Sequence, residues 1–253
     1  MVDGLLDVAA LDLDYGADLR FSLEYVRGDG VRRREPLTAC TGGLFETAAP
    51  VRSFRWAKGA VHFPGLWWSS TTSGHVGFES WLERDHVMLM DFDPAVTGIA
   101  SQPFWLHWQD RDGRPRRHAP DFFARRADGS GVVVDVRPDD RIPPKDAEVF
   151  RVTALACGQA GWEFRRAGAI DPVLRANVRW LSRYRHPRCL CEPAASTLLE
   201  AFADRRPLLA GAALAGDPVL VLPVAYHLLW RRDLICDLSV LLSGTSTTWR
   251  AEG

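Results

Sequence analysis

The sequence predicts a mixed α/β protein with a β-rich N-terminal extension and a helical C-terminal region. Three observations support this prediction: strand-like alternation in residues 1–70, helix and strand spacing in turn over 71–170, and mainly helical spacing over 171–253. These ranges are the three predicted domains. The chain has 253 residues, of which 47% are hydrophobic and 25% charged, so it is long and apolar enough to bury a real core.

The N-terminal extension is expected to consist of short strands. Leu19–Val26 alternates, Arg27–Gly30 is a turn signal, and Val31–Glu35 returns as the second arm of a hairpin. Two further short strands are expected at Val51–Trp56 and Ala60–Phe63. None of these segments carries chemistry beyond that of a scaffold.

The middle region predicts the element order α-β-β-β-α-β. Its expected elements are a helix over 77–91, a strand at 96–108 with a kink at Pro103, strands at 116–125 and 131–137, a helix over 145–158 and a strand at 161–166. The third strand, GVVVDVR, is rich in β-branched residues, which is typical of a central strand. The turn Ala127–Gly131 contains the Asp-Gly pair that favours a tight hairpin.

The C-terminal region predicts helices followed by a hairpin. Helices are expected over 171–188, 197–203, 206–216 and 219–233, and strands at 234–242 and 245–249. Two helices that meet at a Gly-Asp-Pro turn have the spacing of a helix-turn-helix. With the hairpin they resemble a small winged-helix module that binds DNA or a partner.

Composition excludes several classes of protein. The formal net charge is −1, so overall charge does not point to a nucleic-acid partner. The longest apolar run, Val219–Trp230, is too short to span a bilayer. The first residues are acidic where a secretory signal would be basic, and the five cysteines form no C-x-x-C pair. We therefore expect a cytoplasmic protein with reduced thiols and no membrane partner.

Two aspartates on neighbouring predicted strands carry the main chemical signal. Asp135 and Arg137 share one face because side chains alternate along a strand, and Asp121 on the adjacent strand can approach Asp135. Mg²⁺ prefers such carboxylate oxygens, and a bound metal ion activates water against a phosphodiester. A carboxylate inside the apolar run VVVDV needs a cation, because burying a lone charge is costly. The alternative is a structural ion pair between Asp135 and a neighbour such as Arg137.

Three stretches between residues 74 and 167 resemble the TnsA-type endonucleases: SWLERDHVMLMDFDPAVTGIASQPF, APDFFARRADG and VVVDVRP. This family belongs to the PD-(D/E)xK nucleases, so the resemblance implies a restriction-endonuclease-like core and a C-terminal winged-helix domain. It also implies a subunit of a heteromeric transposase that cuts DNA at the 5′ ends of the element. The family's S-x-L-E pattern falls on Ser80–Glu83, and the family's shared glutamine is Gln102. These matches select Glu83 as the helix carboxylate, and Glu79, one turn earlier, is the second choice.

The resemblance implies a complete metal site. Asp121, Asp135, Glu83 and the Val136 carbonyl would hold Mg²⁺ or Mn²⁺. Arg137 stands where the family has its lysine, and this is a departure from the pattern.

The departure matters because arginine stays protonated and cannot act as a general base. Arg137 can still clamp a phosphate oxygen with two hydrogen bonds. The chain has only two lysines, Lys58 and Lys145. Lys145 either swings toward the site or simply opens the following helix. His118, three residues before Asp121, is expected on the opposite face of an ideal strand, as a phosphate or structural contact rather than a base.

Clustered arginines are the second functional signal. Arginines surround Asp121 in sequence, and a second band spans 165–188. Segregated positive charge on a chain of near-zero net charge suggests contact with DNA phosphates, whereas pairing with surface acids is the alternative. The candidate DNA contacts are Arg116, Arg117, Arg125, Arg179, Arg183, Arg231 and Arg232.

These observations predict a Mg²⁺-dependent DNA endonuclease of the TnsA type. The resemblance implies double-stranded DNA as substrate, with a DDE-type transposase subunit and an ATPase regulator as partners. Because Arg137 replaces the lysine, a catalytically impaired DNA-binding or assembly subunit on the same fold is one alternative. A stand-alone restriction, repair or defence nuclease is the other.

Overall fold

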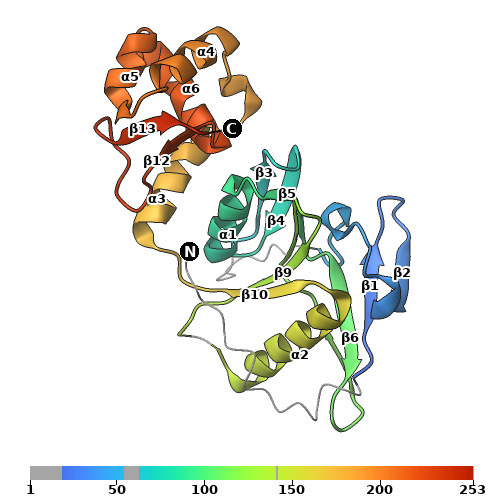
Figure 1. Ribbon diagram of the computed structural model, residues 1–253. Coiled ribbons are helices and arrows are strands. Elements are labelled where there is room, and N and C mark those ends of the chain that lie inside the picture. The colour runs from blue at the N-terminus through green and yellow to red at the C-terminus, as the bar shows by residue number, and fades with distance from the viewer. Residues whose placement is uncertain (1–18, 54–62, 141, 253) are drawn as a thin grey trace. The chain divides into compact units, whose positions relative to one another are not determined.

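The computed structural model describes residues 19–53, 63–140 and 142–252 (Figure 1). The chain divides into two compact units. The first comprises the described residues up to Met90 together with Ala95–Ala169, and the second comprises Asp91–Pro94 together with the chain from Ile170 onward. All five cysteines are free.

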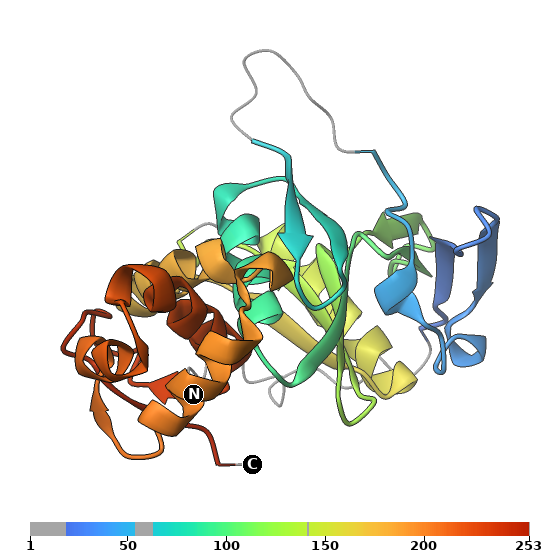
Figure 2. The same ribbon diagram turned by 90° about the horizontal axis from the view of Figure 1, so that it is seen from above.

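One sheet of the first unit has four antiparallel strands in the order β2-β1-β6-β7. Its members are β1 (Ser22–Val26), β2 (Arg32–Pro36), β6 (Phe104–Gln109) and β7 (Pro115–His118). The predicted N-terminal hairpin is therefore confirmed. It does not stand alone, because β1 pairs along its other edge with β6 from the middle of the chain. In Figures 1 and 2 the blue hairpin lies on the side of this unit away from α1.

The second sheet of this unit has the order β10-β9-β8-β5. Its members are β5 (Val96–Ser101), β8 (Phe122–Arg126), β9 (Gly131–Val136) and β10 (Glu163–Ala167). The pair β9–β10 is parallel, because α2 (Pro144–Ala160) provides the crossover that parallel strands need. Every residue of β9 is buried between two neighbouring strands, which confirms the predicted central strand.

Two helices pack on opposite faces of this sheet (Figure 1). They are α2 and α1, which spans Trp81–Phe92. On the α2 face, Phe123 and Val133 join one apolar core with residues of β1 and β6, so this core ties the two sheets together. Trp162 lies at its centre and contacts the rings of Phe45, Phe104 and Phe123.

The first unit differs from the sequence prediction at three places. The helix expected over 77–91 begins only at Trp81, because Gly77 and Phe78 belong to a hairpin that the sequence analysis missed. This hairpin consists of β3 (Gly65–Ser69) and β4 (Gly74–Phe78). The predicted strands 96–108 and 116–125 are each two strands in different sheets.

Breaks in the backbone explain these divisions. Gln102 has a left-handed φ of 46° between β5 and β6, and Ala119–Asp121 separates β7 from β8. Short 3₁₀ helices at Leu37–Ala39 and Phe45–Thr47 complete the unit. The expected strands at 51–56 and 60–63 fall mainly outside the described residues, and Val51–Ser53 is not a strand.

The second unit combines four helices with a three-stranded antiparallel sheet in the order β11-β13-β12. The helices are α3 (Pro172–Leu181), α4 (Glu192–Ala201), α5 (Leu208–Ala215) and α6 (Pro218–Arg231), and the strands are β11 (Arg206–Pro207), β12 (Leu234–Cys236) and β13 (Thr247–Arg250). The predicted helix 171–188 ends at Leu181, and two 3₁₀ turns follow at Ser182–Tyr184 and Pro187–Cys189.

No single helix in the described part of the chain is long and apolar enough to cross a membrane. Helices α5 and α6 meet that criterion only when taken together, and they bend by 118° at the turn between them.

Candidate active site

Asp121 and Asp135 lie beside each other where β8 begins and β9 ends. The backbone N–H of Asp121 donates to Oδ1 of Asp135 at 3.3 Å, and Oδ2 of Asp121 accepts from the backbone N–H of Val136 at 2.7 Å. This geometry follows from the register, because Phe122 pairs with Val134 and Asp121 is thus opposite Asp135. This arrangement confirms the prediction that the two carboxylates lie close together.

The strand geometry also orients the Val136 carbonyl. The N–H of Val136 points toward Asp121, whereas the N–H of Arg137 donates to Ala167 on the other side, at 2.9 Å. A residue's N–H and C=O point to the same edge of a strand, so the Val136 carbonyl faces the Asp121 side. It therefore lies on the edge where a metal ligand is expected.

The electrostatic environment of the pair is unfavourable for two negative charges. Asp135 is only 2% exposed, and Asp121 is half-buried. Burial raises the pKa of Asp121 well above its usual range, and the charges of Asp135 and Glu83 raise it further, against the Val136 N–H and Arg137. The negatively charged form of Asp121 is therefore disfavoured.

His118 holds Asp135 in place. Its Nε2 lies 3.0 Å from Oδ1 and 2.8 Å from Oδ2 of Asp135. The expectation that His118 faces away from the site is therefore wrong. That expectation assumed one continuous strand through Asp121, whereas β7 ends at His118 and the chain turns at Ala119 and Pro120 into the other sheet.

Arg137 follows β9 and reaches toward α2. Its side chain is 46% exposed, and its Nη2 lies 3.4 Å from Oδ2 of Asp146. Lys145 is exposed in the first turn of α2 and does not line the pocket described below. In the described structure Lys145 opens the helix, and its neighbour Asp146 supplies the contact to the site. Lys58 lies outside the described residues.

A cavity of about 280 Å³ opens over the two aspartates. Its lining residues come from both sheets and from α2: Arg52, Trp105, Arg117, His118, Ala119, Asp121, Asp135, Val136, Arg137 and Phe150. Four of these side chains belong to arginine or histidine, so basic groups surround the two aspartates in the cavity. This composition suits an anionic ligand that approaches a carboxylate-bound cation.

Sequence reasoning missed Arg52 and Trp105 as site residues. Arg52 stands in a segment without a motif, and only folding brings it to the cavity. Trp105 lies on β6, where strand alternation alone could have placed it on the same face as His107.

Glu83 lies in the first turn of α1 and completes the capping of this helix by Ser80. Its backbone N–H donates to Ser80 Oγ at 3.1 Å, and its Oε1 accepts from the same hydroxyl at 2.9 Å. Its Oε2 accepts from the N–H of Glu79 at 2.6 Å. This arrangement has the S-x-x-E pattern of a capping box, except that Glu83 accepts from the N–H of Glu79 and not from that of the cap residue Ser80. Burial raises the pKa of Glu83, although these hydrogen bonds oppose the shift.

Glu79 lies outside the helix and has a different partner. Its carboxylate forms a two-pronged pair with Arg52, at 3.0 Å and 2.7 Å. The expectation that Glu79 lies one helical turn before Glu83 is wrong, because the helix begins at Trp81. Glu83 remains near enough to Asp121 to raise its pKa, which favours Glu83 as the third carboxylate.

Gln102 fixes the backbone at the corner before the site. Its N–H donates to the Asp121 carbonyl at 2.9 Å, and its own carbonyl accepts from Val51 at 2.9 Å. The side chain is 2% exposed. The family's shared glutamine thus contacts the backbone of Asp121 in this chain.

The donor set fits Mg²⁺ or Mn²⁺. No three His, Cys, Asp or Glu side chains converge in a ready-made metal site within the described ranges. Magnesium needs fewer, because it keeps several waters and uses one or two carboxylates together with substrate phosphates. Asp121 and Asp135 supply two carboxylates, which the strand register brings together in the lining of the cavity.

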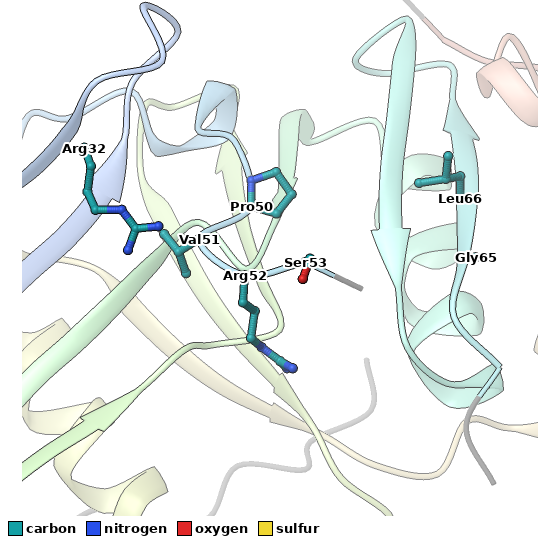
Figure 3. A pocket seen from close by; sticks show the side chains of 7 residues that line it. All are labelled: Arg32, Pro50, Val51, Arg52, Ser53, Gly65 and Leu66. Atoms are coloured by element: carbon teal, nitrogen blue, oxygen red, sulfur yellow. The ribbon is translucent and has the colours of Figure 1, made fainter. Parts of the chain in front are cut away.

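A larger cavity lies beside the site, with a volume of about 620 Å³. Figure 3 shows its lining, with Pro50, Val51, Arg52 and Ser53 on one side and Gly65 and Leu66 on the other. Arg52 lines both cavities, and the larger one presents no cluster of carboxylates or histidines.

The candidate DNA-binding arginines of the first unit differ in their surroundings. Arg117 is exposed at the cavity, and its guanidinium lies over the Trp105 ring at 4.3 Å. Arg116 pairs with Asp110 at 2.8 Å. Arg125 is only 16% exposed and is held by Glu46 and two backbone carbonyls, so it stabilises the fold and is not free to bind DNA.

The candidate arginines of the second unit lie at two places. Arg179 and Arg183 are exposed on or just after α3, and Arg183 lies over the Trp180 ring at 5.0 Å. Arg231 pairs with Asp233 at 2.9 Å, and Arg232 follows the last residue of α6. Both therefore lie at the C-terminal end of α6, whereas helix-turn-helix modules read DNA with the N-terminal part of the second helix.

Comparison with known proteins agrees with the geometry. Residues 93–167, which carry Asp121, Asp135 and Arg137, match the family described as TnsA-like endonuclease N terminal. No curated protein shows significant similarity to the chain. Residues 93–167 are therefore similar to the N-terminal domain of TnsA-like endonucleases, which confirms the resemblance that the sequence motifs carried for this part of the chain.

Proposed function

We propose that this protein is a metal-dependent DNA endonuclease whose active site is the cavity over Asp121 and Asp135. The observation that carries the proposal is the buried carboxylate pair, with its raised Asp121 pKa, inside the TnsA-like endonuclease domain. Structural ion pairs place opposite charges together. Here Asp135 has His118 as a partner, but a second carboxylate, Asp121, lies directly beside it, which is an arrangement expected at a functional site that binds a cation.

Asp121, Asp135 and the Val136 carbonyl are the proposed metal ligands, and Glu83 is the third carboxylate. When bound there, Mg²⁺ or Mn²⁺ supplies Lewis-acid stabilisation of phosphate charge and lowers the pKa of water at the site. The chain's own residues hold these ligands in position. His118 fixes Asp135, the Val136 N–H fixes Asp121, and Gln102 fixes the backbone between the sheets.

The cations around the cavity bind the substrate. Arg137 is half-exposed, and its fork of N–H donors matches the oxygens of a phosphate. It remains protonated and serves to hold charge, not to remove a proton. Asp146 on α2 keeps it oriented toward the site from one side. Arg117 and Arg52 extend the positive lining on the other side.

The wider context follows the family. We propose a restriction-endonuclease-like core, since the sheet β10-β9-β8-β5 with α1 and α2 follows the order α-β-β-β-α-β once β6 and β7 are set aside. We propose a winged-helix-like second unit, which is supported by the order α4-β11-α5-α6-β12-β13. Cutting at the ends of a mobile element, beside a DDE-type transposase subunit and an ATPase regulator, belongs to the same proposal.

The test is cleavage of element-end DNA with Mg²⁺ or Mn²⁺ and the partner subunits present. We expect cutting by the wild type, loss of cutting in Asp121→Ala, and retained DNA binding in that variant. Asp112→Ala, at an exposed turn, is the matched control and cuts normally. Equal cutting by wild type and Asp121→Ala would show that the site is wrong.

A second function is favoured by one observation, the replacement of the family's lysine by Arg137. It is a DNA-binding or assembly subunit on the same fold without cutting activity. Calorimetry with Mn²⁺ separates the two functions. Heat of binding that disappears in Asp121→Asn supports the nuclease, and no binding by the wild type supports the assembly subunit.

A further inference from the structure

The β1–β2 hairpin lies outside the residues that match the endonuclease family, yet it belongs to the same sheet as residues that line the active-site cavity. Trp105 and Arg117 line the cavity and stand on β6 and β7 of the sheet β2-β1-β6-β7. Leu23 and Leu106 on this sheet are buried in the core, so residues on alternate positions form the opposite, outer face. The outer face thus continues from the cavity to the hairpin.

Register places a row of functional groups across this outer face. Arg34 on β2 is opposite Glu24 on β1, and Glu24 is opposite Trp105 on β6. Arg117 on β7 is opposite His107 and lies over the Trp105 ring at 4.3 Å. The row therefore joins the hairpin to the wall of the cavity.

Positive charges on this outer face outnumber the negative ones. Its acid, Glu24, already accepts from Arg32 at 2.5 Å and from His107 at 3.0 Å. Arg34 donates to the hydroxyl of Ser22 at 3.1 Å, and within the described residues neither Arg34 nor Arg117 has a carboxylate partner. Most arginines elsewhere in the first unit do have one, for example Arg33 with Asp29 and Arg116 with Asp110.

We propose that this outer face binds the DNA backbone beside the cut site, with Arg34 and Arg117 contacting phosphates. The inference rests on the proposed nuclease function and assigns a role to the N-terminal hairpin. Three strand spacings separate β2 from β7, about 14 Å, which matches the rise of about four base pairs. The face is thus wide enough to hold a short length of backbone that runs into the cavity.

Phosphate contacts are distinguishable from structural roles by their salt dependence. Each phosphate that a cation neutralises adds about 0.9 to the slope of log binding constant against log salt concentration. The substitutions are Arg34→Gln and Arg117→Gln, singly and together. The matched control is Arg33→Gln, which removes the same charge from the neighbouring residue of β2, whose partner is Asp29.

The measurement is binding of a mixed-sequence DNA duplex at several salt concentrations, without divalent metal. We expect Arg34→Gln and Arg117→Gln each to reduce the slope by about 0.9, and the double variant by about twice that. Arg34→Lys should restore the slope, and Arg33→Gln should leave it at the wild-type value. Thermal unfolding of each variant shows that the fold is retained.

Two failures are distinguishable. If the wild type binds and cuts DNA but Arg34→Gln and Arg117→Gln keep its slope, this inference is overturned and the nuclease proposal stands. If the wild type with its partner subunits neither binds nor cuts DNA, the proposed function fails and the inference fails with it. A slope that falls equally in Arg33→Gln indicates general charge loss and also overturns the inference.

Discussion

Nε2 of His118 lies 2.8 Å from Oδ2 of Asp135 and 3.0 Å from Oδ1, so one imidazole contacts both carboxylate oxygens of a residue that is only 2% exposed. The two residues come from different sheets, because His118 ends β7 and Asp135 lies in β9. This contact therefore ties β9 to the sheet that carries the N-terminal hairpin.

Removal of this imidazole should disturb the site more than the fold. In His118→Ala the buried Asp135 loses its side-chain donor, and we expect a loss of roughly 1–3 kcal/mol in the free energy of unfolding. Cutting should fall more strongly than DNA binding, because Asp135 is no longer held in one orientation. Denaturant unfolding and single-turnover cleavage measure both effects, with His75→Ala, at an exposed histidine, as control. Wild-type cutting by His118→Ala would contradict a positioning role.

The two glutamates near α1 should behave differently. Glutamine can take the place of glutamate in capping a helix, so Glu83→Gln should keep the capped N-terminus of α1 and fold normally. It should lose the ability to cut DNA. Glu79→Gln weakens the half-exposed pair with Arg52, at a cost of about 1 kcal/mol or less, and should still cut. Cleavage and thermal unfolding of both variants give the comparison. The reverse pattern, with cutting lost only in Glu79→Gln, would make Glu79 the metal ligand.

Arg137 tests whether the site can work without its lysine. Arg137→Lys keeps the charge but loses the two-pronged grip, and we expect kcat to fall about tenfold, or about 1.4 kcal/mol of transition-state stabilisation. Arg137→Gln should lose more. Because Arg137 supplies no base, the pH profile of the residual cutting should keep its shape in Arg137→Gln. Full activity of Arg137→Gln would exclude this role.

Asp121→Asn should stabilise the metal-free protein while it abolishes cutting. The asparagine oxygen can still accept from the Val136 N–H, and the repulsion with Asp135 and Glu83 is gone. Each kcal/mol gained corresponds to roughly 2–4 °C in Tm for a chain of this size. Scanning calorimetry without divalent metal measures the shift. A lower Tm in Asp121→Asn would mean that the carboxylate is satisfied without metal.

His86 should make the fold sensitive to acid. Its Nε2 lies 2.8 Å from the Gly168 carbonyl, and burial lowers its pKa, with Asp85 and Asp139 opposing the shift and Arg165 adding to it. A lowered pKa in the folded state means that the stabilisation is present above about pH 6.5, the unfolded value, and is lost as pH falls through the folded value.

The matching variant is His86→Gln, whose amide can donate to the same carbonyl. We expect its unfolding free energy to fall less steeply than that of the wild type between neutral and mildly acidic pH. His75→Gln, at an exposed position, should follow the wild type. Denaturant unfolding over this pH range gives the slopes, and identical slopes in wild type and His86→Gln would contradict the assignment.

Local patterns in the sequence were sufficient for most elements. The β-branched run of β9, the Asp-Gly turn before it and the helical spacing of α2 each determine a local structure, and each is present. The pairing of Asp121 with Asp135 followed from the same patterns, because strand alternation and one hairpin fix their register.

Breaks between sheets were not predictable from periodicity. The strand-like sequence pattern continues through Gln102 without interruption. The left-handed φ of Gln102 nevertheless breaks the strand there, so that β5 and β6 belong to different sheets. The same happens at Ala119–Asp121, which is why His118 was placed on the wrong side. Arg52 reaches the cavity through tertiary folding alone, and no local pattern marks it.

The central claim is that Asp121 and Asp135 form the metal site of a nuclease, and a manganese-soaked crystal tests it most directly. We expect an anomalous manganese peak within coordination distance of a carboxylate oxygen of each aspartate and of the Val136 carbonyl, and no peak there in Asp121→Asn. The absence of a peak at this site in the wild type, or a peak that survives in Asp121→Asn, would contradict the claim.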